Sequence, residues 1–134
     1  MGGLVLKLAP NERILLNGLM IENGPKKARM TLHSDGAHVL RLRDALHPDQ
    51  VTGPVSIAYH VAQLAVAGQT DPQNALDDLR LRLDDLSRTF ENTWAFDAVA
   101  NARRALEDSN FYKAMRELGP LLPLERDLLG ETAS

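Results

Sequence analysis

We predict an α+β protein, in which an N-terminal antiparallel β-meander or small barrel precedes a bundle of about four helices. Short apolar segments separated by turn-forming dipeptides occupy the first third of the chain, a pattern typical of strands. Beyond Pro48 the apolar residues recur every three or four positions, which is typical of helices. We therefore divide the 134 residues into a β-lobe (1–47), a helical bundle packed on it (48–126) and a frayed tail (127–134).

Turn residues define the predicted strands. Pro10-Asn11-Glu12 and Ser34-Asp35-Gly36 predict turns, and Asn17-Gly18 and Asn23-Gly24 predict tight hairpin turns because both residue types accept a positive φ. The five strands expected between these turns are 4–8, 13–16, 19–21, 28–32 and 37–40.

Capping residues and prolines define the predicted helices. The first has Pro54 at its first position and ends at Gly68, and the second opens at Asp71-Pro72. The third is capped by Asn92-Thr93, with Trp94, Ala98, Ala102 and Leu106 on one face. The fourth starts after Ser109 or Asn110 and ends at Gly119-Pro120.

The second predicted helix carries apolar residues at alternating steps of three and four, as in a coiled coil. We call these residues the leucine seam: Leu76, Leu79, Leu83, Leu86 and Phe90. They could pack on neighbouring helices of the same chain, or they could form a surface for a partner helix or a second copy of the chain, giving a homo-oligomer.

Composition excludes several classes of protein. The chain has no cysteine, which excludes disulfides, thiolate catalysis and Cys-ligated zinc, and which fits a reducing cytosol. Met1-Gly2-Gly3-Leu4 lacks the features of a secretory signal, and no apolar run approaches the ~20 residues that cross a bilayer. We predict a soluble cytoplasmic protein that does not enter a membrane.

Catalytic and metal-binding patterns are weak. His33 and His38 flank a predicted turn, but no third ligand has suitable spacing. Asp77-Asp78 and Asp84-Asp85 alternate with arginines at spacings that favour ion pairs along a solvated helix face. No nucleophile motif or phosphate-binding glycine loop is present. We therefore predict no catalytic residue, no metal site and no cofactor.

Charge is distributed unevenly. Residues 1–54 hold seven Lys/Arg against five acids, a balance of +2, whereas residues 55–134 hold eight against thirteen, a balance of −5. A polyanion would therefore bind the first third. Arg41 and Arg43 share a face if their segment is extended. The cations expected to hold phosphates of a nucleic acid are Lys26, Lys27, Arg29, Arg41 and Arg43.

A series of short motifs in order resembles the FlbT family of flagellar biosynthesis repressors. The matching segments are 6–13, 16–18, 23–24, 39–44, 48–52, Pro54, Tyr59, 111–118 and Glu125.

The resemblance implies a non-enzymatic post-transcriptional regulator that binds the 5′ untranslated region of flagellin mRNA and promotes its decay. In that interpretation Lys113 and Arg116 aid the phosphate contacts, and Tyr112 either stacks on a base or is a buried anchor of the last helix. The alternative is a protein-interaction module whose helical half binds flagellin or another flagellar assembly or regulatory protein.

Overall fold

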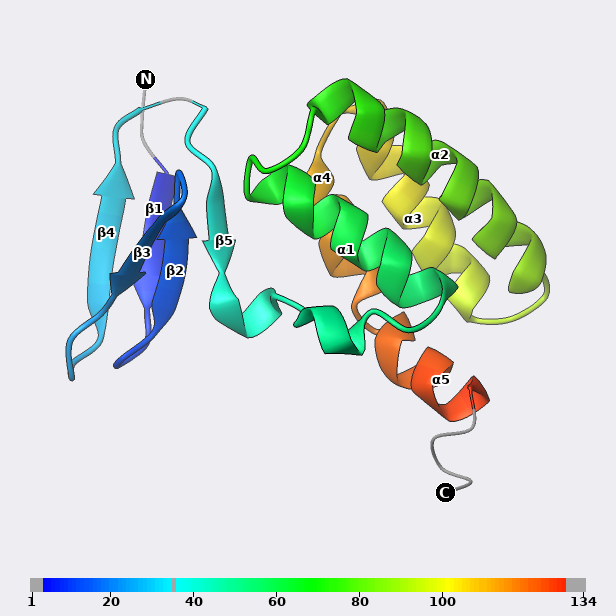
Figure 1. Ribbon diagram of the computed structural model, residues 1–134, viewed down its shortest axis with the longest axis horizontal. Coiled ribbons are helices and arrows are strands. Elements are labelled where there is room, and N and C mark those ends of the chain that lie inside the picture. The colour runs from blue at the N-terminus through cyan, green and yellow to red at the C-terminus, as the bar shows by residue number, and fades with distance from the viewer. Residues whose placement is uncertain (1–3, 35, 130–134) are drawn as a thin grey trace. The chain divides into compact units, whose positions relative to one another are not determined.

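The computed structural model describes residues 4–34 and 36–129, which form two compact units. The β unit comprises Met1–Ala45 and Val66–Gly68, and the helical unit comprises Leu46–Ala65 and Gln69–Ser134. The predicted α+β class is confirmed, with antiparallel strands followed by helices (Figure 1). Asp35 of one predicted turn, and residues 130–134 of the predicted tail, lie outside the described residues.

The strands form two small sheets, and they do not close into a barrel. β1 (Leu4–Leu8) pairs antiparallel with β4 (Ala28–Leu32). β2 (Arg13–Leu16) lies between β3 (Leu19–Glu22) and β5 (Val39–Arg41), and both pairings are antiparallel. The predicted meander order is therefore wrong, because β1 pairs with β4, and among the strands that the structure describes only β2 and β3 form a hairpin of consecutive strands.

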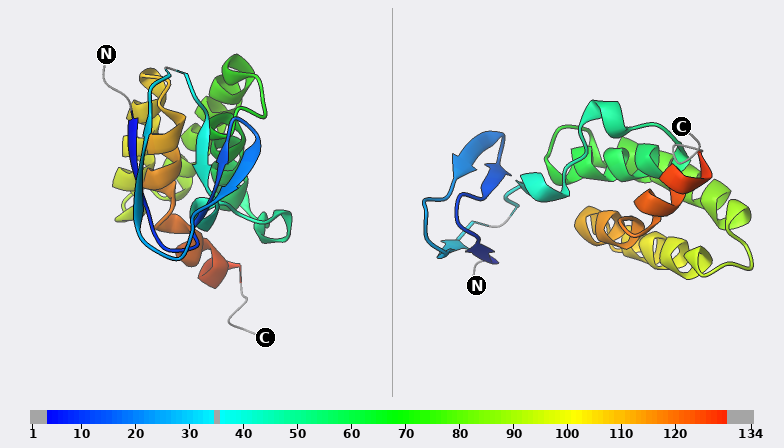
Figure 2. Two further views of the ribbon diagram at one scale, coloured as in Figure 1. Left: turned by 90° about the vertical axis from the view of Figure 1, so that its left-hand side faces the viewer. Right: turned by 90° about the horizontal axis from the view of Figure 1, so that it is seen from below.

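The two sheets are joined by a long hairpin that bends in its middle. Asn23 N–H donates to the Glu12 carbonyl and Asn11 N–H to the Gly24 carbonyl, both at 2.8 Å, which extends the β2–β3 pairing up to the bend. Pro10 and Pro25 follow on the two sides, and neither has an N–H to continue the pairing. Figures 1 and 2 show the two loops of the bend side by side at one end of the β unit.

This bend explains which of the predicted hairpin turns forms. Asn17 and Gly18 have φ of 50° and 84° and connect β2 to β3 as predicted. Asn23-Gly24 instead crosses from one sheet to the other, so the predicted hairpin turn is wrong there. The Asn23 side chain stabilises the crossing, because its Nδ2 donates to the carbonyls of Ala9 (2.7 Å) and Lys26 (2.9 Å).

A small apolar core holds the β unit together. Leu6, Leu8 and Ile14 are buried, and Ile21, Met30, Leu32 and Val39 pack against them. Because side chains alternate along a strand, burial of Leu6 and Leu8 directs Lys7 to the opposite, solvent-exposed face of β1.

In the described part of the helical unit there are five helices, where about four were predicted. They are α1 (Pro54–Val66), α2 (Pro72–Thr89), α3 (Ala95–Glu107), α4 (Phe111–Leu118) and α5 (Leu121–Leu128). The 3₁₀ turns η1 (Leu42–Asp44) and η2 (Pro48–Gln50) precede them. Gly119-Pro120 ends α4 as predicted, but α5 follows at once, because proline is compatible with the start of a helix.

Most of the predicted helix caps are present. Asp71 accepts from Asn74 N–H at 3.0 Å at the start of α2, and Asn110 accepts from Lys113 N–H at 3.0 Å at the start of α4. The predicted face of the third helix is wrong at Trp94, which is 61% exposed. The residues that α3 buries are Ala95, Val99, Ala102, Ala105 and Leu106.

The leucine seam lies in the core of its own unit. Each of its five side chains is at most 9% exposed, and α2 packs against α3. A partner helix would have to displace a helix of the same chain to reach them. Within the described part of the chain, no helix has the length and apolar character required to cross a bilayer.

The N-terminus of α1 is capped by a carboxylate from α5. Glu125 is 6% exposed and accepts from the N–H groups of Val55 (2.5 Å) and Ser56 (3.0 Å). A carboxylate is stabilised there by the unpaired N–H groups and the helix dipole. Gly53 makes this approach possible, because a Cβ at that position would lie 2.7 Å from Glu125 Cδ.

Candidate anion-binding groove

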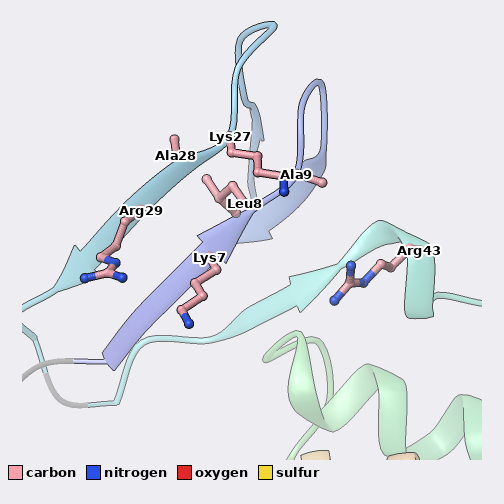
Figure 3. Close-up of a pocket in the computed structure, with 7 residues that line it drawn as sticks. All are labelled: Lys7, Leu8, Ala9, Lys27, Ala28, Arg29 and Arg43. Atoms are coloured by element: carbon pink, nitrogen blue, oxygen red, sulfur yellow. The ribbon is translucent and has the colours of Figure 1, made fainter.

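An open hollow of about 510 Å³ lies on the surface of the β unit, and we call it the cationic groove (Figure 3). Its apolar lining comes from Leu8, Ala9 and Ala28. Its charged lining consists of four residues, the groove cations: Lys7, Lys27, Arg29 and Arg43. β1 and β4 with the loop before it supply the first three, and η1 supplies the fourth.

The pairing of β1 with β4 brings two cations face to face. Lys7 is directly opposite Arg29 in the register, and Figure 3 shows the two side chains next to each other on neighbouring strands. Like charges in this position destabilise a sheet. Among the ion pairs of residues 4–34 and 36–129, none includes Lys7, Lys27 or Arg29. The positive charge of Lys7, Lys27 and Arg29 is therefore not balanced by an ion pair within the described residues.

Arg41 and Arg43 have different surroundings, contrary to the predicted shared face. Arg41 is only 15% exposed in its side chain, and its Nη1 contacts Glu12 Oε2 at 2.8 Å. Arg43 is 60% exposed in its side chain, and its Nε lies 3.9 Å from the same carboxylate oxygen. Arg43 lines the groove, whereas the charge of Arg41 is balanced by Glu12.

Opposing influences act on the pKa of Glu12. Burial of its side chain, which is 7% exposed, favours the neutral form. The Ala9 N–H, the hydrogen bond and charge of Arg41, and the charge of Arg43 favour the carboxylate, and together they prevail. The pKa of Glu12 is therefore lowered from its ordinary value of 4.5, and the Glu12–Arg41 ion pair is present at neutral pH.

The other predicted RNA-binding residues lie outside the groove. Lys26 is exposed in the loop before β4 but does not line the hollow. Tyr112, Lys113 and Arg116 belong to α4 in the helical unit, and all three are exposed. Tyr112 is 47% exposed, so it is not a buried anchor.

Two residues of this site, Lys7 and Glu12, are not among the binding residues that the sequence predicts. The position of Lys7 between Leu6 and Leu8 is enough to predict that its side chain points outward. Its pairing with Arg29 cannot be predicted in this way, because it depends on a contact between distant segments. The sequence predicts Glu12 only as a turn residue, whereas in the structure it joins the turn after β1 to the end of β5.

The acidic pairs of α2 are engaged in ion pairs. Asp78 contacts Arg82 at 3.1 Å and Asp77 lies 3.9 Å from Arg80. Asp85 pairs with Arg88, and Asp84 pairs with Arg103 of α3. The described residues contain no group of three or more His, Cys, Asp or Glu side chains that could hold a metal ion.

Fold and groove together define a small α+β protein with a cationic hollow on its β unit. The family model described as flagellar protein FlbT matches residues 4–129, which is most of the chain. The chain belongs to the FlbT family.

Relatives from several bacteria match nearly the full chain. The flagellum biosynthesis repressor protein FlbT of Caulobacter vibrioides is 27% identical over 98% of this chain and 92% of its own length. A probable flagellum biosynthesis repressor protein FlbT of Rhodopseudomonas palustris is 31% identical over 92% of this chain and 95% of its own. One of Mesorhizobium japonicum is 28% identical over 95% and 85%. No solved structure matches the chain with statistical significance.

Proposed function

We propose that this protein is a non-enzymatic repressor of flagellin synthesis that acts after transcription in the cytoplasm. It binds the 5′ untranslated region of flagellin mRNA through the cationic groove and promotes decay of the message. Membership of the FlbT family and the names of its relatives support a regulatory role in flagellum biosynthesis. The groove supports a nucleic acid as the ligand.

The observation that carries the proposal is the pairing of Lys7 with Arg29. Two cations that face each other destabilise the sheet, and a phosphate placed between them would relieve the repulsion. Lys27 precedes Arg29 by two residues and extends the positive charge into the loop before β4. None of the seven lining residues is aromatic, so the groove suits the phosphate backbone better than stacked bases.

Salt-dependent titration of labelled flagellin leader RNA tests this proposal. The double variant Lys7→Ala/Arg29→Ala should bind roughly tenfold more weakly at low salt. It should also reduce the slope of log affinity on log salt concentration by about 1.4, since each single-strand phosphate contact contributes about 0.7. Equal affinity of variant and wild type, or no binding by the wild type, would contradict the proposal that RNA binds in the groove.

The matched control is Arg80→Ala/Arg88→Ala. Like the test variant it removes two positive charges, but from exposed positions of α2, where both arginines are paired with aspartates. We expect affinity close to that of the wild type. If the wild type binds no RNA, and nuclease-treated pull-downs recover flagellin or another flagellar protein, the protein-interaction alternative is favoured.

A further inference from the structure

We propose that Glu12 is a positioning residue of the cationic groove. Its carboxylate holds Lys7 through Arg41, and Arg43 directly, in the places where they contact a phosphate. This inference rests on the proposed use of the groove as a polyanion site, and it assigns an acidic residue an indirect role in binding, through the cations that it positions.

The Glu12 carboxylate joins three segments of the β unit. Its Oε1 accepts from Ala9 N–H at 2.9 Å, in the turn after β1. Its Oε2 accepts from Arg41 Nη1 at 2.8 Å, at the end of β5, and lies 3.9 Å from Arg43 Nε in η1. Ala9 and Arg43 both line the groove, so the same side chain contacts two parts of its wall.

Arg41 extends this arrangement to a third lining residue. Its Nη1 also donates to the Lys7 carbonyl at 3.1 Å. The Lys7 backbone is therefore held by Arg41 as well as by the pairing of β1 with β4. Since the Glu12 and Arg41 side chains are 7% and 15% exposed, water offers them few alternative partners. Loss of either would leave a largely buried charge unpaired, which is costly.

Positioning and simple electrostatics predict opposite effects of removing this acid. If Glu12 acted only through its charge, its neutralisation would strengthen the binding of a polyanion. If Glu12 positions the groove cations, neutralisation releases Arg41, disturbs Lys7 and Arg43, and weakens binding. The sign of the change therefore distinguishes the two roles.

The experiment measures binding of a labelled oligouridylate at low salt by wild type, Glu12→Gln and Glu22→Gln. Both variants remove one negative charge from the β unit. Glu22 is a matched control because it pairs with the exposed Arg13 at 2.8 Å and does not line the groove. We expect Glu12→Gln to bind about tenfold more weakly, with a salt slope smaller by about 0.7 for each lost phosphate contact, and Glu22→Gln to bind at least as tightly as wild type.

Glu12→Asp provides a second, charge-neutral comparison. Its carboxylate is shorter by one methylene group, so it cannot reach both Ala9 N–H and Arg41 in the present geometry. Circular dichroism and urea unfolding establish the folded fraction of each variant. If Glu12→Gln does not fold, Glu12→Asp decides the matter: weakened binding supports positioning, and unchanged binding overturns it.

The outcomes separate this inference from the function on which it rests. If the wild type binds oligouridylate and a folded Glu12→Gln binds equally or more tightly, Glu12 is not a positioning residue. The proposal that the groove binds RNA is then unaffected. If neither wild type nor Glu22→Gln binds leader RNA or oligouridylate, the proposed function fails and the inference fails with it.

Discussion

Glu12 makes the stability of the β unit depend on pH. Because its pKa in the folded protein is lowered, Glu12 contributes stability that is fully present above its unfolded pKa and is lost as pH falls through the folded value. We expect Glu12→Gln to reduce the free energy of unfolding at about pH 7, by roughly 1–3 kcal/mol for a charged hydrogen bond. The difference from wild type should shrink as pH falls below the ordinary carboxyl pKa of 4.5 and through the lowered pKa of Glu12 in the folded protein.

Urea unfolding at several pH values measures this difference. Glu22→Gln is again the control, since the Glu22–Arg13 pair is more than half exposed on both sides and contributes little. A difference between Glu12→Gln and wild type that stays constant with pH would show that the carboxylate charge of Glu12 is not what stabilises the fold.

Single residues also show where sequence spacing fails. Arg41 and Arg43 are two positions apart, which places them on one face only if both are extended. Arg41 ends β5, whereas Arg43 lies in the 3₁₀ turn η1, so the alternation stops between them. The sequence identified Lys27, Arg29 and Arg43 as phosphate-contact candidates, and the structure places all three at the groove.

At the scale of elements, contact between α5 and the start of α1 depends on Gly53. Gly53→Ala would introduce a Cβ within 2.7–2.9 Å of three atoms of the Glu125 carboxylate. We expect a loss of about 1–3 kcal/mol in the free energy of unfolding, as for overpacking in a core. Urea unfolding followed by the helical circular dichroism signal measures this loss.

A double-mutant cycle identifies the cause of that loss. The three atoms nearest to the new Cβ all belong to the Glu125 carboxylate, so the cost of Gly53→Ala should largely vanish in a Glu125→Ala background. Glu125→Ala alone should also destabilise, because two buried N–H groups of α1 lose their acceptor. Additive losses would contradict the proposed contact.

Local signals predicted some boundaries better than others. Asn17-Gly18 and Asp71-Pro72 specify their turn and helix start by their own backbone preferences, and both predictions are confirmed. Asn23-Gly24 and Gly119-Pro120 mark breaks correctly, but the partner of the next strand and the start of another helix depend on residues elsewhere in the chain.

For the molecule as a whole, the proposed function predicts an effect in cells. In a strain whose own copy is deleted, the Lys7→Ala/Arg29→Ala variant at wild-type abundance should fail to repress a reporter fused to the flagellin leader. The reporter mRNA should also persist longer than with the wild-type protein. Repression equal to that of the wild type would contradict a role for the groove, and Arg80→Ala/Arg88→Ala controls for the change in net charge.

The sequence by itself determined the α+β class, the five strands, most helix starts and the concentration of positive charge in the first third. These follow from side-chain period, turn chemistry and composition, which act over a few residues. Only the tertiary structure decided that β1 pairs with β4, that Lys7 faces Arg29, and that Glu12 balances Arg41. The hydrogen bond from Val55 at the start of α1 to Glu125 likewise joins residues 70 positions apart. Such contacts depend on how distant segments meet, because the free energy that selects them comes from packing and pairing between elements.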